Sequence, residues 1–199
     1  MPRPPRADEA GGLYHALNRG NLRADIFKKE ADFIAFEKLL FEGLQLHQVE
    51  LFSYQLMSNH YHLVLRPLVL GEMSRFMGWI GGTHTMRYHA QYHTSGLGHV
   101  YQQRYKSFLI QSDEHFFVVC RYGERNALRA GRVARAEDWR WGSLWRWLAF
   151  ICTAWASAGR RRLGGIDRTK TSFGIHHASQ GTPASPSPAG NHKQRGLTH

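Results

Sequence analysis

The chain has 199 residues and an ordinary hydrophobic content of 42%, but a formal net charge of +11 and an isoelectric point near 10.1 make it strongly basic. This length allows one domain with a sizeable core, the charge favours a polyanionic partner, and two cysteines are too few for a disulfide framework. The N-terminus lacks the apolar segment of a secretory signal, and the longest apolar run, residues 147–158, is too short to span a bilayer. We therefore expect a cytoplasmic protein with no membrane segment.

Apolar spacing and turn residues predict that strands and helices alternate from residue 13 onward. The predicted strands are residues 13–18, 49–56, 61–66 and 106–111, and the predicted helices are residues 30–46, 71–91 and 114–130. This order is a repeated split β-α-β unit. We therefore expect an α+β fold of the ferredoxin-like type, in which a four-stranded antiparallel sheet carries helices on one face.

The two ends of the chain differ in composition from the region between them. Residues 1–12 carry Pro, Arg and Gly and are predicted to be disordered. Residues 13–147 form the predicted domain, and its tryptophan-rich last stretch, residues 137–147, could pack as a lid on the core. Residues 148–199 are predicted to be a low-complexity, disordered tail with a basic charge balance.

Two histidines, His60 and His62, lie on the third predicted strand directly after a turn. Because strand side chains alternate between faces, both imidazoles project from the same face, about 7 Å apart along the strand. Two neutral imidazoles placed in this way can begin a divalent-metal site. The alternative is a pair of surface histidines on a solvated sheet face.

Tyr122 and Asn126 lie four residues apart on the third predicted helix and therefore share one of its faces. In the plain interpretation, the tyrosine packs at the core edge and the asparagine bonds near the helix end. Arg121, Arg125 and Arg129 form a second stripe on the same helix. This stripe is either a solvated basic face or a row of phosphate contacts.

A chemical argument connects the phenol with the two imidazoles. A tyrosine oxygen can attack phosphorus in a DNA backbone and form a covalent ester when the phosphate is polarised and positioned. A divalent ion on His60, His62 and the side-chain oxygen of Asn126 would supply this, because three protein ligands leave positions for phosphate oxygens and water. Mixed nitrogen and oxygen ligation with open positions suits Mn²⁺ or Mg²⁺. Tyr122 is then the candidate nucleophile.

The remaining histidines of the middle region show no spacing that would bring them to His60. His84, His89, His93 and His99 are therefore predicted to be surface residues. The place of His15 stays open, because the first strand should lie next to the third in a ferredoxin-like sheet.

Five stretches of the chain together carry a family resemblance. They are YHALNRGN (residues 14–21), QLMSNHYHLVLRP (55–67), GHVYQQRYKSF (98–108), CRYGERNALRAGRV (120–133) and EDWRWGSLWR (137–146). In this order they resemble the REP-associated tyrosine transposases, which belong to the single-tyrosine HUH transposases of bacterial insertion sequences.

The resemblance implies an HUH domain of a bacterial, nucleoid-associated enzyme that cuts and rejoins single-stranded, hairpin-bearing DNA with a divalent ion during transposition. By position in the motifs, His60 and His62 match the metal-binding pair and Asn126 the third ligand. Tyr122 matches the nucleophile that holds the 5′-phosphate while a 3′-hydroxyl is freed. Gly123 departs from the family pattern, which has a large apolar residue there, and so weakens the helix that aims the phenol.

Three functions are compatible with these observations. The first is an enzyme that nicks and transfers DNA strands, and the second is a catalytically silent hairpin-DNA-binding module of the same fold. The third is a metal-dependent hydrolase, which would cleave without a covalent adduct. For the first two we expect DNA contacts from Arg121, Arg125, Arg129, Arg104, Lys106 and Arg19. The sequence does not decide between a monomer and a homodimer.

Overall fold

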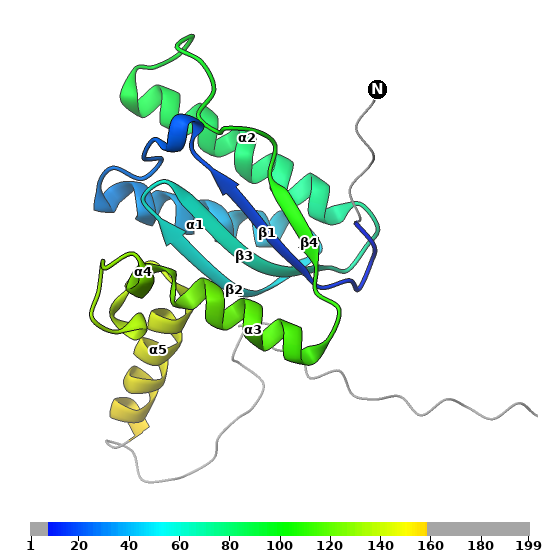
Figure 1. Ribbon diagram of the computed structural model, residues 1–199, viewed down its shortest axis with the longest axis vertical. Coiled ribbons are helices and arrows are strands. Elements are labelled where there is room, and N and C mark those ends of the chain that lie inside the picture. Colours follow the sequence, from blue (N-terminus) through cyan, green and yellow to red (C-terminus); the bar gives the residue numbers. More distant parts are fainter. Residues whose placement is uncertain (1–7, 159–199) are drawn as a thin grey trace, which may run out of the picture.

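The computed structural model describes residues 8–158 (Figure 1). Its strands are β1 (Tyr14–Arg19), β2 (Val49–Met57), β3 (His60–Pro67) and β4 (Lys106–Leu109). Its α-helices are α1 (Glu30–Leu46), α2 (Glu72–Tyr92), α3 (Asp113–Glu124), α4 (Asn126–Arg129) and α5 (Ser143–Ala158), and its 3₁₀ turns are η1 (Asn21–Arg23) and η2 (Ala136–Asp138). The four predicted strands and the first two predicted helices are confirmed to within two residues at each end.

The four strands form one sheet in the order β2-β3-β1-β4, and every neighbouring pair is antiparallel. Both α1 and α2 cover the same face of this sheet (Figure 1). The predicted ferredoxin-like α+β fold is therefore confirmed. In this order β3 and β1 are the two central strands, so a residue on β3 lies in the middle of the sheet.

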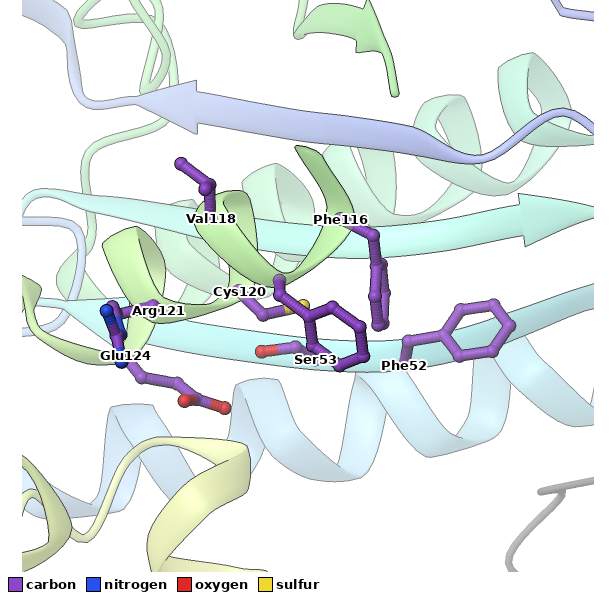
Figure 2. A pocket seen from close by; sticks show the side chains of 8 residues that line it. Phe52, Ser53, Phe116, Val118, Cys120, Arg121 and Glu124 are labelled. Atoms are coloured by element: carbon purple, nitrogen blue, oxygen red, sulfur yellow. The ribbon is translucent and has the colours of Figure 1, made fainter. Parts of the chain in front are cut away.

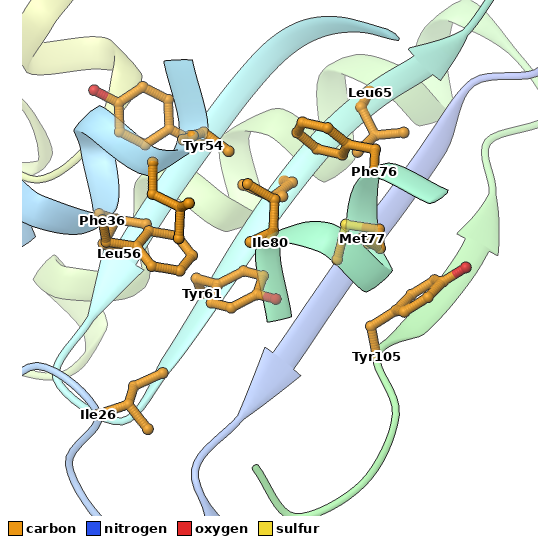
Figure 3. Close-up of a cluster of buried hydrophobic side chains, with 14 of the residues drawn as sticks. Ile26, Phe36, Tyr54, Leu56, Tyr61, Leu65, Phe76, Met77, Ile80 and Tyr105 are labelled. Carbon is orange, nitrogen blue, oxygen red and sulfur yellow. The ribbon is translucent and has the colours of Figure 1, made fainter. Parts of the chain in front are cut away.

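The hydrophobic core lies between the sheet and these two helices (Figure 3). Alternate residues of the central strands face it: Tyr14 and Ala16 on β1, and Tyr61, Leu63 and Leu65 on β3, are at most 1% exposed. The helices meet them with a continuous apolar stripe made of Phe36, Leu39 and Leu40 on α1 and Met73, Phe76, Met77 and Ile80 on α2. The intervening strand residues point to the opposite face, because side chains alternate along a strand.

The opposite face of the sheet carries α3 and α4 (Figure 1). The third helix was predicted to run without a break to residue 130, and that prediction was wrong. It ends at Glu124, and Arg125, with φ −84° and ψ 3°, separates α3 from the short α4. The break follows from the local sequence, since Gly123 and Asn126 are both weak helix formers.

A turn after β1 holds the tip of the β2–β3 hairpin. Gly20 begins this turn, and a Cβ at its position would clash with the carbonyl oxygen of Ala24, so the close approach requires glycine. The amide of Gly20 donates to the carbonyl of Asn59 over 2.8 Å. Two non-glycine residues follow in the left-handed region, Leu22 with φ 52° and Arg23 with φ 61°.

The outer edge of β2 is covered by the tryptophan-rich stretch. Trp141 is buried and stacks on Phe33 with ring centroids 4.8 Å apart, and its carbonyl accepts a hydrogen bond from the amide of Leu56. The indole of Trp139 donates to the carbonyl of Leu56 over 2.8 Å. This stretch therefore packs on the core edge, as the composition of residues 137–147 suggested.

The predicted domain boundary at residue 147 falls inside a helix. α5 continues to Ala158 because residues 147–158 contain strong helix formers and neither Gly nor Pro, so the predicted disordered tail does not begin at 148. At the other end, the side chain of Asp8 accepts from the amides of Met73 and Ser74 at the start of α2, so residue 8 is also held in place. Residues 1–7 and 159–199, the remainder of the two segments predicted to be disordered, lie outside the described residues. Among residues 8–158, no helix is long and apolar enough to cross a membrane.

Candidate active site

The candidate site lies on the sheet face that points away from α1 and α2. His60 and His62 reach this face from β3, near the centre of the sheet. Their cross-strand partners are Arg19 and Met57 for His60, and Leu17 and Gln55 for His62. Directly paired residues share a face, so the side chain of Arg19 begins beside the imidazole of His60.

Both imidazoles converge on a single side chain from α4. Nδ2 of Asn126 lies 3.2 Å from Nε2 of His60 and 2.9 Å from Nε2 of His62. The three side chains chosen from the sequence therefore meet, although 64 and 66 residues separate the asparagine from the histidines. The helix break at Arg125 does not prevent this, because α4 keeps Asn126 against the strand.

Two further side chains contact the far nitrogens of the imidazoles, and the sequence did not identify either as part of the site. Nε2 of His15, on β1, lies 2.9 Å from Nδ1 of His62, and the two rings stack with centroids 5.1 Å apart. Oδ1 of Asn59 lies 2.6 Å from Nδ1 of His60. For His15, the expected pairing of the first strand with the third was the feature that pointed to the site. Asn59 carried no signal beyond its place in the turn.

Burial keeps the imidazoles of the site neutral. It lowers the pKa of His60 to about 4, with a further contribution from the positive charge of Arg19. It lowers the pKa of His62 to about 3, with contributions from His15 and His60. The pKa of His15 is also lowered, by burial and by His115. Near neutral pH these nitrogens therefore keep a lone pair that can bind an ion or accept a proton.

The predicted nucleophile lies beside the imidazole pair. The ring of Tyr122 meets that of His62 edge to face, with centroids 6.2 Å apart. Tyr122 is 47% exposed. The guanidinium carbon of Arg129 lies 4.4 Å from the centroid of the Tyr122 ring. The phenol is thus accessible to a large ligand and has both an imidazole and a cation as neighbours.

The residues predicted to contact DNA do not form one surface. Lys106 pairs with Leu17 across β4 and β1, so it lies on the histidine face together with Arg19. Arg129 lies against Tyr122, whereas Arg121 lines a cavity on another side of α3. The predicted arginine stripe is therefore divided, because α3 and α4 are separate helices. The two remaining predicted residues are exposed outside the strands: Arg104 and Arg125.

That cavity, of about 630 Å³, opens between α3 and β2 (Figure 2). Phe52 and Ser53 of β2 line it opposite Phe116, Cys120 and Arg121 of α3, and neither histidine of the site reaches it. Its lining is largely apolar, unlike the convergent polar groups around Asn126. The cavity is therefore separate from the candidate site, and it leaves α3 supported over only part of its length.

The donor set at Asn126 fits a divalent ion. Two imidazole lone pairs face the N–H bonds of the Asn126 carboxamide, which occupy the position that a cation would take. Rotation of the carboxamide by half a turn would place its oxygen there instead, giving two nitrogens and one oxygen. No group of three His, Cys, Asp or Glu side chains suited to a metal occurs within residues 8–158. The carboxamide of Asn126 is the side chain that both Nε2 atoms face, so it is the candidate for a third ligand here.

One histidine predicted to lie at the surface is a core residue. His84 is 7% exposed, packs on the rings of Phe27 and Phe36, and lies 2.6 Å from the hydroxyl of Tyr101 through Nδ1. The prediction was wrong because it treated the histidine alone. Its position four residues after Ile80 continues the apolar stripe of α2.

Comparison with known proteins agrees with this architecture. The family model of the IS200-like transposases matches residues 11–126. A solved REP-associated tyrosine transposase, bound to a REP hairpin, superposes with a TM-score of 0.61 at 18% identity over 75% of this chain and 86% of that one. A candidate transposase from Deinococcus radiodurans gives a TM-score of 0.44 at 15% identity over 61% of this chain and 93% of that one. No curated protein sequence matches. Because the family model covers more than half of the sequence, the chain belongs to the IS200-like transposase family.

Proposed function

We propose that this transposase nicks and rejoins single-stranded, hairpin-bearing DNA through a 5′-phosphotyrosine intermediate on Tyr122, with a divalent ion at His60, His62 and Asn126. The observation that carries the proposal is the convergence of both Nε2 atoms on Asn126, with the phenol ring 6.2 Å from the ring of His62. An imidazole pair, a carboxamide and an accessible phenol on one sheet face have the composition of a phosphoryl-transfer site.

In the first step the phenolic oxygen of Tyr122 attacks phosphorus and forms a Tyr–O–P bond. The P–O3′ bond breaks, the phenol loses its proton, and the departing 3′ oxygen gains one. The 5′-phosphate then remains on the protein and a 3′-hydroxyl is released. In the second step a 3′-hydroxyl attacks the phosphotyrosine, restores a phosphodiester and frees the phenol. The ester keeps the energy of the original bond, so rejoining needs no nucleotide cofactor.

The bound ion, Mn²⁺ or Mg²⁺, would neutralise charge on the phosphate oxygens and so make phosphorus more electrophilic. Arg19 supports the same role from the protein side. Among the described residues its Nε is buried without a hydrogen-bond partner, although it begins directly beside His60. A buried donor of this kind is stabilised when a phosphate oxygen accepts from it. Arg129 adds a second positive charge at the face of the Tyr122 ring.

The proposed DNA substrate follows from the charge and from the similar fold. The solved transposase of that fold holds a REP hairpin, and the present chain places Arg19 and Lys106 on the same face as its histidines. Sequence-independent contacts of this kind to the backbone position a nucleic acid. We propose that these two residues, with Arg129, hold the strand that enters the site.

The proposal is tested with a single-stranded oligonucleotide that contains an imperfect hairpin and a radioactive label at either end. With Mn²⁺, wild-type protein should shift the 3′-labelled strand to the position of a protein–DNA adduct on a denaturing gel. The 5′-labelled strand should instead yield a shorter, free fragment that ends in a 3′-hydroxyl. Tyr122→Phe should abolish both products and bind the hairpin within about threefold of wild type, because only the attacking oxygen is removed.

The matched control is Tyr88→Phe, which removes a phenolic hydroxyl from α2, on the covered face of the sheet. It should leave adduct formation unchanged. Hairpin binding without any adduct in the wild type would indicate the catalytically silent binding module. Cleavage without an adduct would indicate the metal-dependent hydrolase. An adduct that persists in Tyr122→Phe would show that another residue is the nucleophile.

A further inference from the structure

A chain of hydrogen bonds behind His60 has only one consistent direction. It starts at the backbone carbonyl of Arg23, which can only accept, so Nδ2 of Asn59 donates to it over 3.1 Å. Asn59 therefore presents Oδ1, which also can only accept, to Nδ1 of His60 at 2.6 Å. His60 must then carry its proton on Nδ1. Its Nε2 is left with the lone pair.

The same logic continues through the site to His62. Nε2 of His60 accepts from Nδ2 of Asn126, and the second hydrogen of that amide points to Nε2 of His62. His62 therefore also accepts at Nε2 and carries its proton on Nδ1. The Nδ1–H of His62 then donates to Nε2 of His15, 2.9 Å away, which must accept the hydrogen bond. Both imidazoles of the site thus carry Nδ1–H, and a side chain behind each ring accepts from it.

The two ends of this chain are fixed by the fold. His15 lies on the central strand β1, and its ring stacks on that of His62. On the other side of β1, its partner on β4 is Phe108, with ring centroids 6.3 Å apart. At the opposite end, Leu22 and Arg23 adopt left-handed backbone conformations. Such conformations are unfavourable for any residue other than glycine. Here they direct the Arg23 carbonyl at Asn59.

We propose that His15 and Asn59 are positioning residues that hold His62 and His60, respectively, in the Nδ1–H tautomer, so that both Nε2 lone pairs face the ion-binding position. Outer hydrogen-bond partners of metal-binding histidines generally fix ring orientation and tautomer in this way. The inference rests on the proposed role of these histidines. Its first test, however, requires neither DNA nor metal, so it can fail or succeed independently of strand transfer.

The first test is the tautomer of each imidazole in metal-free protein, read from long-range ¹H–¹⁵N correlation spectra at a pH where both rings are neutral. Wild type should show Nδ1–H on His60 and His62. His15→Phe should convert His62 to a mixture with Nε2–H and leave His60 unchanged. Asn59→Leu should do the reverse. Each variant is the control for the other, because a general loss of structure would move both signals.

The second test is Mn²⁺ affinity, measured by calorimetry without DNA. His15→Phe should weaken binding about 10- to 100-fold, which is the usual effect of losing an outer hydrogen-bond partner. His15→Gln restores a side-chain oxygen that can accept from Nδ1–H and should recover binding to within about threefold of wild type. His99→Phe, at an exposed histidine that makes none of these hydrogen bonds, should have no effect.

Two results would overturn the inference. One is an Nε2–H tautomer of His62 in wild type, or a His62 tautomer that His15→Phe does not change. The other is a loss of Mn²⁺ binding in His15→Gln as complete as in His62→Ala, since His15 would then be a metal ligand itself. If instead the tautomers respond as expected and no protein–DNA adduct ever forms, the positioning role stands and the strand-transfer proposal fails.

Discussion

Acid should destabilise this protein through a histidine that has no part in the candidate site. His84, on α2, is buried against the rings of Phe27 and Phe36, and burial lowers its pKa to about 4 from the ordinary 6.5. In the unfolded chain the same imidazole takes up a proton near pH 6.5, whereas in the folded protein it resists protonation down to pH 4. Folding stability is therefore complete above pH 6.5 and is lost as the pH falls from 6.5 towards 4.

The magnitude follows from the two pKa values. Together they limit the contribution of His84 to about 3 kcal/mol, of which about 2.5 kcal/mol is lost between pH 7.5 and pH 4.5. His84→Gln removes the titration but keeps a side chain that can bond to the hydroxyl of Tyr101. The variant should be somewhat less stable than wild type at pH 7.5 and should close that gap, or reverse it, at pH 4.5.

The measurement is urea denaturation followed by circular dichroism, repeated at half-unit pH steps between 4.5 and 7.5. The informative quantity is the difference in unfolding free energy between variant and wild type at each pH, because other titrating groups cancel in it. His99→Gln, at an exposed histidine, should give a constant difference near zero. A constant difference for His84→Gln as well would refute the reasoning, because the buried imidazole would then not be resisting protonation.

Three further predictions concern packing and charge. Gly43→Ala should destabilise the protein by about 1–3 kcal/mol in the same denaturation assay, because a Cβ there would lie 2.9 Å from a ring carbon of Phe76. Gly82→Ala on α2, with open space around it, should instead stabilise the protein by about 1 kcal/mol. Arg146→Met should cost about 2 kcal/mol in that assay, because it leaves the carboxylate of Glu37, whose side chain is 7% exposed, without its cation; an unchanged midpoint would contradict this. Arg129→Gln should slow single-turnover adduct formation about tenfold, since it removes the positive charge from the face of the phenol ring. An unchanged rate would show that this charge does not act in the reaction.

Local patterns were sufficient for the parts of the fold that depend on one element at a time. The apolar spacing of residues 30–46 predicted α1 with its observed bounds, and the alternation around the hairpin predicted which face His60 and His62 share. Tyr122 and Asn126 could be selected because four residues along a helix return to nearly the same face. The helix break between them was missed, because Gly123 was expected to weaken the helix but a weak helix former does not by itself fix where a helix ends.

Features that depend on how two elements meet could not be predicted in the same way. His15 reaches His62 because β1 and β3 pair in one particular register, and strand spacing alone does not fix that register. Asn59 joins the site only because the turn at Arg23 brings a carbonyl to it. His84 was assigned to the surface because no spacing linked it to His60, and its partner Tyr101, from the loop after α2, could not be foreseen from α2 alone.

The helix break at Arg125 separates Tyr122, on α3, from Asn126, on α4. Asn126 is attached to the strand through the imidazoles, whereas α3 buries only Gly123 and borders an open cavity along β2. The backbone at Arg125 is thus the point where the direction of the segment that carries Tyr122 can differ from that of Asn126. In the proposed strand transfer, a change of this angle would let the phenol of Tyr122 withdraw with one DNA end before a second end takes its place.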